Sequence, residues 1–403
     1  MKKRILSTAS VAVTTLVSSV IVFLLFLPAC NQVIKTGPNE IVKLTLTQQA
    51  SVEKLNSSRL FSSVKCIALA TGEESLVGEI VKIVRREGYI YVADREALYR
   101  FTEEGVFSGK ISKQGNGPDE YTGISDFEIE STDRIWILNR NMLRLYAWNG
   151  ALIKQIKLDV GAAKMYLIAP GKMCLYIGNE RVENNQHQVK IIDLDTENIL
   201  SNHLEIDENR ATYLHIQAPN HFCPRDEGKG VAYFYNLFDE HIYALSEDGI
   251  EKRFQMDMFG KNIPASFYEA KYNDVGYFFQ ALFSHDYAYG TVFFMECRNV
   301  YLYSCLYGGK SHLAFISKKT NESVVDFTTL VEDRVLEGYP IDLTENRMHV
   351  QGNHEIIIPL YPSDIMEYGE SHPELRDRIK EAIHYENEEQ NAVLLTIRIK
   401  DEI

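Results

Sequence analysis

An internal repeat of about 45 residues constrains this chain more than any other feature of its sequence. The segment Ile90–Arg95 aligns with Ile135–Arg140 at an offset of 45 residues, and the alignment continues without a gap through the turn that follows. A third copy lies 144 residues after the first, where Leu98–Gly105 aligns with Ile242–Gly249. A repeat of roughly this length is typical of a fold in which one small supersecondary unit recurs and packs against its neighbours.

Each unit contains four short runs of aromatic and β-branched residues that are separated by turn residues. In the first unit these runs are Glu79–Val84, Tyr89–Ala93, Leu98–Thr102 and Val106–Ile111. The whole chain contains 23 Tyr and 19 Phe, and aromatic side chains suit the half-buried surface of a strand. No amphipathic helix separates the runs, which excludes a parallel α/β sheet. We therefore predict an all-β protein, a six-bladed β-propeller with four-stranded antiparallel blades.

Four units are visible across residues 80–258, and the strand-rich residues 275–330 and 335–400 supply units five and six. A closed ring must cover its edge strands, because unpaired edges bind other chains. We therefore expect Leu60–Leu69 to pair with the last blade and close the ring, so that the propeller domain spans residues 60–403.

One short helix is predicted near the C-terminus. Ser371–Glu374 offers an N-cap and an early Pro, and Leu375, Ile379 and Ala382 follow at helical spacing. Polar residues from Glu386 end this helix, and a last strand is expected over Val393–Lys400.

The N-terminus resembles a bacterial lipoprotein signal. Lys2, Lys3 and Arg4 precede 25 residues without a charge, and Cys30 ends this apolar stretch. We predict a signal peptide over residues 1–29, lipidation of Cys30, and an anchor and spacer over residues 30–59. The alternative is an uncleaved membrane anchor, since the stretch is long enough to span a bilayer. Either anchor places the protein outside the cytoplasm in the cell envelope, and the lack of an acidic run after Cys30 favours the periplasm over the cell surface.

Charge and cysteine content exclude several classes of function. The chain has 42 Lys and Arg against 56 Asp and Glu, with a net charge of −14 and no basic stripe, so a nucleic-acid partner is not expected. The five Cys other than Cys30 show no metal-ligand spacing. We expect them to be buried apolar residues, with a disulfide between Cys297 and Cys305 as the alternative. No catalytic motif, metal site or cofactor site is predicted.

A loop between the first two units resembles a known family. Gly115–Tyr121, with the sequence GNGPDEY, is similar to the linker of NHL-type propellers, and we expect Tyr121 to pack as a wedge. Together with Ser75–Ile80 and Asn391–Leu395, in which Ala392 replaces a commoner Pro, it resembles the six-bladed β-propeller lipoproteins of anaerobic Gram-negative commensal bacteria. The resemblance covers about residues 58–403. It implies a six-bladed propeller and assigns neither an activity nor a catalytic residue.

Strand direction alternates within a blade, so the loop after strand two and the loop that leaves strand four open on one rim. The ligand-binding candidates on this rim are Asp94, Arg95, Gln114, Glu120, Asn139 and Arg140. Arg95 and Arg140 occupy equivalent positions in adjacent units, where they would bind a carboxylate or sulfate together. The alternative is that these arginines bridge the blades through nearby acidic side chains.

A dense group of aromatic residues gives a second candidate surface. Its members are Tyr277, Phe278, Phe279, Phe283, Tyr287, Tyr289, Phe293 and Phe294. They form either a platform on which sugars stack or the packing between blades. The sequence thus favours a membrane-tethered, non-catalytic binding or scaffolding module for a glycan, a peptide or an envelope protein. The alternatives are a lactonase-like or lyase-like enzyme at the channel mouth and a purely structural subunit of an envelope complex.

Overall fold

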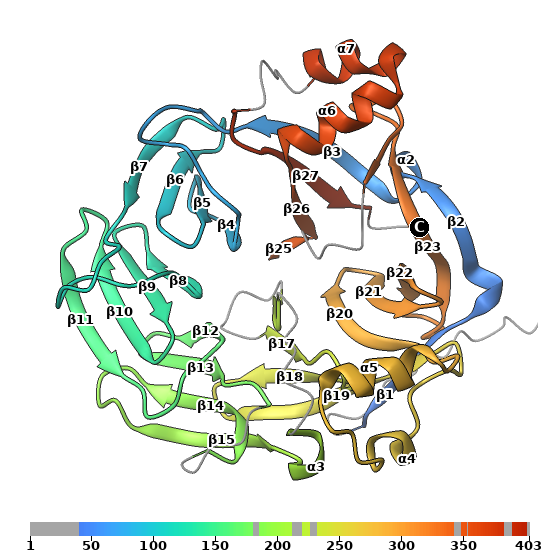
Figure 1. Cartoon of the computed structure of the whole chain (residues 1–403), viewed down its shortest axis with the longest axis horizontal. Helices are drawn as coiled ribbons and strands as arrows, with labels where there is room; N and C mark the ends of the chain where they lie inside the picture. Colours follow the sequence, from blue (N-terminus) through green and yellow to red (C-terminus); the bar gives the residue numbers. More distant parts are fainter. Residues whose placement is uncertain are drawn as a thin grey trace, which may run out of the picture. The chain divides into compact units, whose positions relative to one another are not determined.

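Six antiparallel sheets stand side by side in a ring in the computed structural model of this protein (Figure 1). The structure describes residues 40–179, 185–211, 220–225, 232–341, 348–352, 354–382 and 389–400. The predicted signal peptide and Cys30 lie outside these residues. The ring of six blades with four antiparallel strands each confirms the predicted β-propeller.

The first three blades follow one another in sequence without insertion of a foreign strand. Blade one contains β4 (Lys82–Arg86), β5 (Tyr89–Ala93), β6 (Leu98–Thr102) and β7 (Phe107–Ile111). Blade two contains β8 (Asp126–Ser131), β9 (Arg134–Asn139), β10 (Met142–Ala147) and β11 (Leu152–Lys157). Blade three contains β12 (Lys164–Ala169), β13 (Lys172–Tyr176), β14 (His187–Asp193) and β15 (Ile199–Glu205). The repeat of 45 residues is therefore the step from blade one to blade two.

The remaining blades complete the ring. Blade four contains β16 (Phe222–Pro224), β17 (Ala232–Tyr235), β18 (His241–Ser246) and β19 (Gly249–Met258). Blade five contains β20 (Tyr289–Glu296), β21 (Val300–Tyr307), β22 (Lys310–Ser317) and β23 (Ser323–Glu332), and β24 (Tyr339–Ile341) pairs with the end of β23. Blade six contains β25 (His349–Gly352), β26 (Glu355–Leu360), β27 (Val393–Ile399) and, from the other end of the chain, β3 (Phe61–Ala68).

The pairing of β3 with β27 confirms that an N-terminal strand closes the ring. A buried amide reinforces the joint between blade six and blade one. The Asn391 side chain donates to the carbonyl oxygens of Ala70 and Ser75, and it accepts from the amide of Val77 at 2.8 Å. The two terminal segments on which the family resemblance rested are thus bonded to each other.

The segment before β3 differs from the expected spacer. β1 (Val42–Leu46) pairs in parallel with β19, and β2 (Ser51–Asn56) pairs in parallel with β23, so each adds a fifth strand to its blade. The short helices η1 (Gln48–Ala50) and α2 (Ser57–Leu60) connect the strands. Alternate side chains of β1 are buried in the core shared with blade five. This alternation is the two-residue period of a strand, but a segment of five residues is too short to show the period clearly in the sequence.

Helices occur only as insertions between strands in the part of the chain that the structure describes. Besides η1 and α2, they are α3 (Glu208–Ala211), α4 (Ala265–Tyr268), α5 (Val275–Phe283), α6 (Pro362–Ser371) and α7 (Pro373–Ala382). The predicted C-terminal helix is confirmed as α7, and α6 precedes it. Helix α5 was not predicted, because its aromatic residues suit a strand equally well; Asp274 caps it by accepting from the amides of Gly276 and Tyr277.

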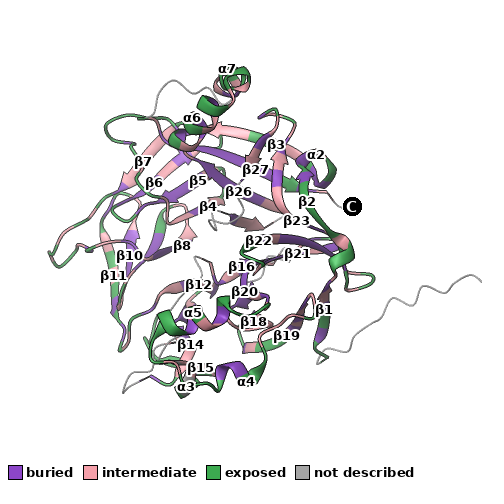
Figure 2. Ribbon diagram, turned by 45° about the vertical axis from the view of Figure 1, so that its right-hand side comes forward, coloured by how far each residue is buried: buried purple, intermediate pink, exposed green. Residues whose placement is uncertain are grey.

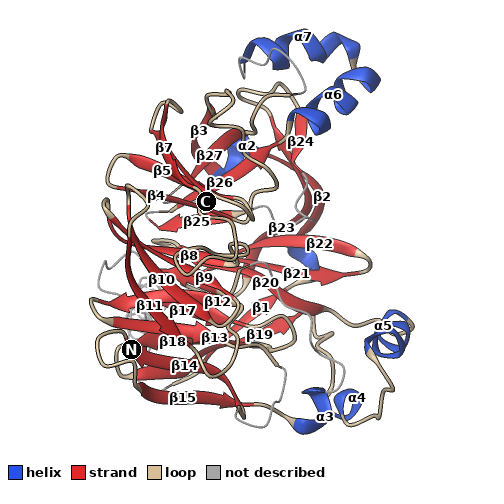
Figure 3. Cartoon of the chain, turned by 60° about the vertical axis from the view of Figure 1, so that its left-hand side comes forward, coloured by secondary structure: helices blue, strands red, loops and turns tan. Residues whose placement is uncertain are grey.

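The helices α3 to α7 all lie in connections that leave the same rim, which we call the connection rim. It carries the loop between strands two and three of each blade and the link from each blade to the next, and Figure 3 shows α3 to α7 together on one side. Among the described residues, no helix combines the length and the apolar composition that crossing a bilayer requires.

Burial follows the strands rather than the helices (Figure 2). Apolar side chains on both faces of the strands pack between adjacent blades, as the stacking of sheets requires. Cys174, Cys223, Cys297 and Cys305 are buried there as thiols, as expected, whereas Cys66 on β3 is only partly buried. A disulfide between Cys297 and Cys305 is not formed.

The parallel strand β1 leads to a stability prediction. Leu44 is fully buried, whereas Ile41, just outside the strand, is 44% exposed. We expect Leu44→Ala to lower the free energy of unfolding by about 2–5 kcal/mol, because it leaves a cavity between blades four and five. Ile41→Ala is the matched control and should change it by less than about 0.5 kcal/mol. Urea denaturation measures both, and equal small effects would show that β1 is a dispensable spacer.

Candidate functional site

The loop that carries the family resemblance is a structural joint. The Tyr121 side chain is only 1% exposed, which confirms that it packs as a wedge. Its hydroxyl accepts from the amide of Lys113 and lies 3.0 Å from the carbonyl oxygen of Glu96. The Glu120 carboxylate accepts from the amide of Gly117, and a side chain at Gly115 would overlap this carboxylate.

The predicted rim residues lie in these same connections, but most of their polar groups form hydrogen bonds within the turns and loops themselves. Asp94 is buried, and its carboxylate accepts from the amides of Gly78, Glu96 and Ala97 at 2.7–2.8 Å. Asn139 accepts a hydrogen bond from Thr122, and Gln114 forms a backbone bridge with Tyr121.

The two predicted arginines are exposed. The Arg95 side chain is 76% exposed and lies 3.5 Å from Glu79. Arg140 is exposed in a left-handed backbone conformation with φ 54°. Among the described residues, no ion pair joins Arg95 or Arg140 to Asp94, Asp119 or Glu120, the acidic residues expected to bridge the blades. Joint binding of an anion by Arg95 and Arg140 stays a prediction.

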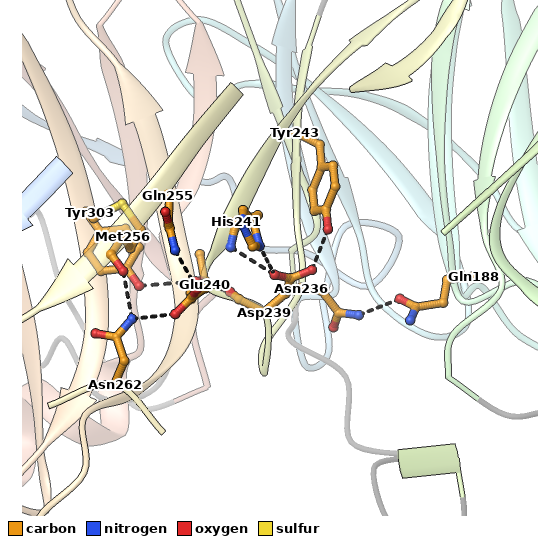
Figure 4. A network of polar contacts seen from close by, with 11 residues as sticks. Gln188, Asn236, Asp239, Glu240, His241, Tyr243, Gln255, Met256, Asn262 and Tyr303 are labelled. Carbon is orange, nitrogen blue, oxygen red and sulfur yellow. Dashed lines mark hydrogen bonds and ion pairs between the residues drawn. The ribbon is translucent and has the colours of Figure 1, made fainter. Parts of the chain in front are cut away.

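A larger pocket of about 520 Å³ opens on the connection rim between blades four and five. Its floor is the loop between β17 and β18, and its walls come from the link that carries α4 and α5. The polar residues that matter most to its chemistry are Asp239, Glu240, His241 and Asn262. Figure 4 shows two adjoining groups of hydrogen-bonded side chains, one around Asp239 and one around Glu240.

Asp239 is held in a fixed orientation. Its carboxylate accepts from the amide and the ring Nδ1 of His241, both at 2.9 Å, and from the hydroxyl of Tyr243 at 2.6 Å. Burial opposes ionisation, but the hydrogen bonds from His241 and Tyr243 outweigh it and hold the pKa of Asp239 below its ordinary value. The carboxylate is therefore ionised at neutral pH.

Glu240 is fixed by two amide side chains (Figure 4). Its carboxylate accepts from Gln255 at 2.7 Å and from Asn262 at 2.8 Å, and Asn262 also donates to the carbonyl oxygen of Met256. A carboxylate has about four acceptor sites, so about two remain on Glu240 for a ligand.

Aromatic side chains form the other side of the pocket. Phe238 and Tyr289 stack with ring centroids 6.2 Å apart, and the Arg210 guanidinium lies over the Tyr268 ring at 3.9 Å. The predicted aromatic group is divided by the fold. Phe293 and Phe294 pack inside the protein, Tyr289 lines the pocket, and Phe283 on α5 is 68% exposed.

The pocket between blades four and five uses the same type of loop as the predicted rim residues, but in a blade where sequence reasoning placed no candidate. At the offset of 144 residues, Asp239 and Glu240 occupy the positions of Arg95 and Glu96. Extending the repeat alignment three residues upstream would have found the pair. Asn262 and Tyr289 could not be found this way, because Asn262 lies in the link between blades four and five and Tyr289 begins β20 at the end of that link, which is much longer than the link between blades one and two.

The innermost strands enclose a second cavity of about 310 Å³ at the centre of the ring, which we call the central channel. β4, β8, β12, β16 and β25 all contribute to its lining. Lys82 reaches across from blade one to Asp126 at 2.9 Å and to Glu128 at 2.7 Å. Within the described ranges, no three His, Cys, Asp or Glu side chains are grouped so that they could hold a metal ion.

His349 in the channel generates a prediction about pH. Burial and the ammonium groups of Lys164 and Lys82 lower its pKa to about 3. Between about pH 6.5 and this value the unfolded chain binds a proton that the folded protein does not. The free energy of unfolding should therefore fall as the pH drops below 6.5, by at most about 1.4 kcal/mol per pH unit from this residue.

Urea denaturation at pH 4 to 7 tests this effect. His349→Gln should show a shallower loss of stability toward acid than the unsubstituted protein. His285→Gln is the control, because His285 is exposed and should leave the slope unchanged. An unchanged slope in His349→Gln would contradict a buried, neutral His349.

Other proteins of known structure share this architecture. No curated protein matches the chain. A Bacteroides fragilis protein described as exported has a similar structure, with a TM-score of 0.69 and 16% identity over 90% of this chain and 100% of that one. A DUF4221 family member from Bacteroides vulgatus has a TM-score of 0.49 and 10% identity over 85% and 98%. The model of the domain of unknown function DUF4934 matches residues 41–398. The chain therefore belongs to the DUF4934 family.

Proposed function

We propose that this protein is a membrane-tethered, extracytoplasmic binding module whose ligand is a neutral glycan held in the pocket between blades four and five. The observation that carries the proposal is the pair of fixed carboxylates, Asp239 and Glu240, facing an aromatic wall. The proposed role is non-catalytic.

The charge of the pocket favours a neutral ligand. Asp239 and Glu240 are matched in number by Arg210 and Lys252, which line the same pocket. A ligand with hydroxyl groups can donate to the remaining acceptor sites of the carboxylates without adding a charge. Because the network holds both carboxylates in place, binding loses little side-chain entropy.

The size and the apolar wall of the pocket suit a sugar. The pocket has a volume of 520 Å³, and a water-sized group occupies about 30 Å³. The pocket therefore holds roughly seventeen such groups, which is one sugar ring and part of a second. The stacked rings of Phe238 and Tyr289 provide apolar surface for the C–H groups of a pyranose.

The proposed location rests on the N-terminal sequence. The segment ending at Cys30 supports lipidation, and the similar Bacteroides fragilis protein described as exported agrees with a place outside the cytoplasm. We propose that the propeller faces the periplasm. β1 begins at Val42, so about eleven residues separate Cys30 from the fold and reach at most roughly 40 Å.

Binding of neutral disaccharides tests the ligand class. We expect maltose, cellobiose, lactose or chitobiose to give a calorimetric titration with a protein that begins after Cys30. Glu240→Gln and Phe238→Ala should each weaken binding by roughly tenfold, since each removes a contact of about 1.4 kcal/mol. Glu247→Gln is the control, because Glu247 lies in an exposed turn of the same blade. If none of the disaccharides binds, the glycan proposal is wrong, and a peptide or an envelope protein becomes the proposed partner.

Cys30→Ala tests the anchor separately. In cells given a labelled fatty acid, the unsubstituted protein should carry the label and sediment with membranes. The variant should lose the label and appear in the soluble fraction. A variant that still sediments without the label would support the uncleaved membrane anchor instead.

A further inference from the structure

The ammonium group of Lys164 lies in the central channel without a close counter-ion. Lys164 begins β12, the innermost strand of blade three, and lines the channel with residues of four other blades. Of the carboxylates in the part of the chain that the structure describes, none lies within ion-pair distance of it. An ammonium group has three hydrogen-bond donors and no acceptor, so the donors of Lys164 are available to a ligand in the channel.

The two channel carboxylates are already engaged elsewhere. Asp126 is fully buried, and it accepts from Lys82, from its neighbour Phe127 and from the amide of Met165 at 2.8 Å. Glu128 accepts from Lys82 at 2.7 Å. Lys82 completes its own coordination with the carbonyl oxygen of Phe127. Both channel carboxylates therefore have Lys82 as their ion-pair partner, and none of the described carboxylates is left to pair closely with Lys164.

The surroundings of Lys164 disfavour its charged form. Burial and the repulsion of Lys82 outweigh the attraction of Asp126 and lower the pKa of Lys164. On the other side of the channel, the positive charges of Lys164 and Lys82 also lower the pKa of His349 in blade six. Lys164 is part-buried, an unmatched charge in such a site costs stability, and groups of this kind cluster at functional sites.

We propose that the central channel is a second binding site, separate from the pocket between blades four and five, for a small carboxylate whose oxygens accept hydrogen bonds from Lys164. A single negative charge matches the single unpaired ammonium group. A doubly charged phosphate or sulfate would meet stronger repulsion from Asp126 and Glu128, which share one lysine. A volume of 310 Å³ holds about ten water-sized groups, which limits the ligand to a small acid.

Lactate and its neutral counterpart lactamide are the probes, and a saturation-transfer NMR titration measures their binding. Lactate should bind the unsubstituted protein, and lactamide should not. Lys164→Met should weaken lactate binding by roughly tenfold or more, because it removes a charge-assisted hydrogen bond. Lys164→Arg keeps the charge and should restore part of the affinity. Lys172→Met, at a surface ion pair in the same blade, is the control and should bind like the unsubstituted protein.

Thermal unfolding without ligand gives a second, independent readout. If Lys164 is kept for a ligand, Lys164→Met should raise the melting temperature, because it removes an unmatched, part-buried charge. A lower melting temperature would show that Lys164 mainly balances Asp126 and Glu128, and would overturn the proposal. Absence of lactate binding, equal binding of lactamide, or undiminished binding by Lys164→Met would also overturn it. Glu240→Gln should leave lactate binding unchanged, so failure at this site is distinguishable from failure of the glycan proposal.

Discussion

The pairing of β3 with β27 is the interaction on which the rest of the structure depends. A blade is stable only when both of its faces are covered by neighbouring blades, and that condition holds for every blade only if the ring closes. Closure brings residues from the two ends of the chain into one sheet, with Leu395 opposite Cys66. Asn391 then bonds the closing blade to the segment that enters blade one. The strands β1 and β2 extend this principle, because they tie the N-terminal segment to blades four and five before it reaches blade six.

A closed ring leaves its connections free to differ from blade to blade. In blade one, the loop between strands two and three is a tight turn at Asp94, whose carboxylate accepts hydrogen bonds from backbone amides of the turn. The equivalent loop in blade four presents Asp239 and Glu240 to a pocket, because the link that follows β19 rises over it with α4 and α5. Similar loops therefore have different chemistry, and the difference comes from what covers them.

The two candidate sites also differ in how their charges are balanced. In the pocket on the connection rim, two acidic and two basic side chains line one cavity, and side-chain amides hold Glu240 in place. In the central channel, Lys82 pairs with both carboxylates, and none of the carboxylates that the structure describes lies within ion-pair distance of Lys164. The first arrangement favours a polar, uncharged ligand, and the second favours an anion. One propeller can hold both because the rim and the channel are lined by different parts of each blade.

The sequence by itself determined the architecture. The repeat predicted the blades, the strand at Leu60–Leu69 predicted the closure, and Ser371–Glu374 predicted the start of α7, because each of these signals is local in the chain. The short alternation in β1 and the aromatic helix α5 were missed, since five residues define a period poorly and aromatic residues suit both kinds of element. Only the tertiary structure decided which rim loops could form a site. Residues as distant as Asp239 and Tyr289, or Lys82, Lys164 and His349, meet because the ring brings successive blades to a common centre and rim, and no local pattern in the chain records that meeting.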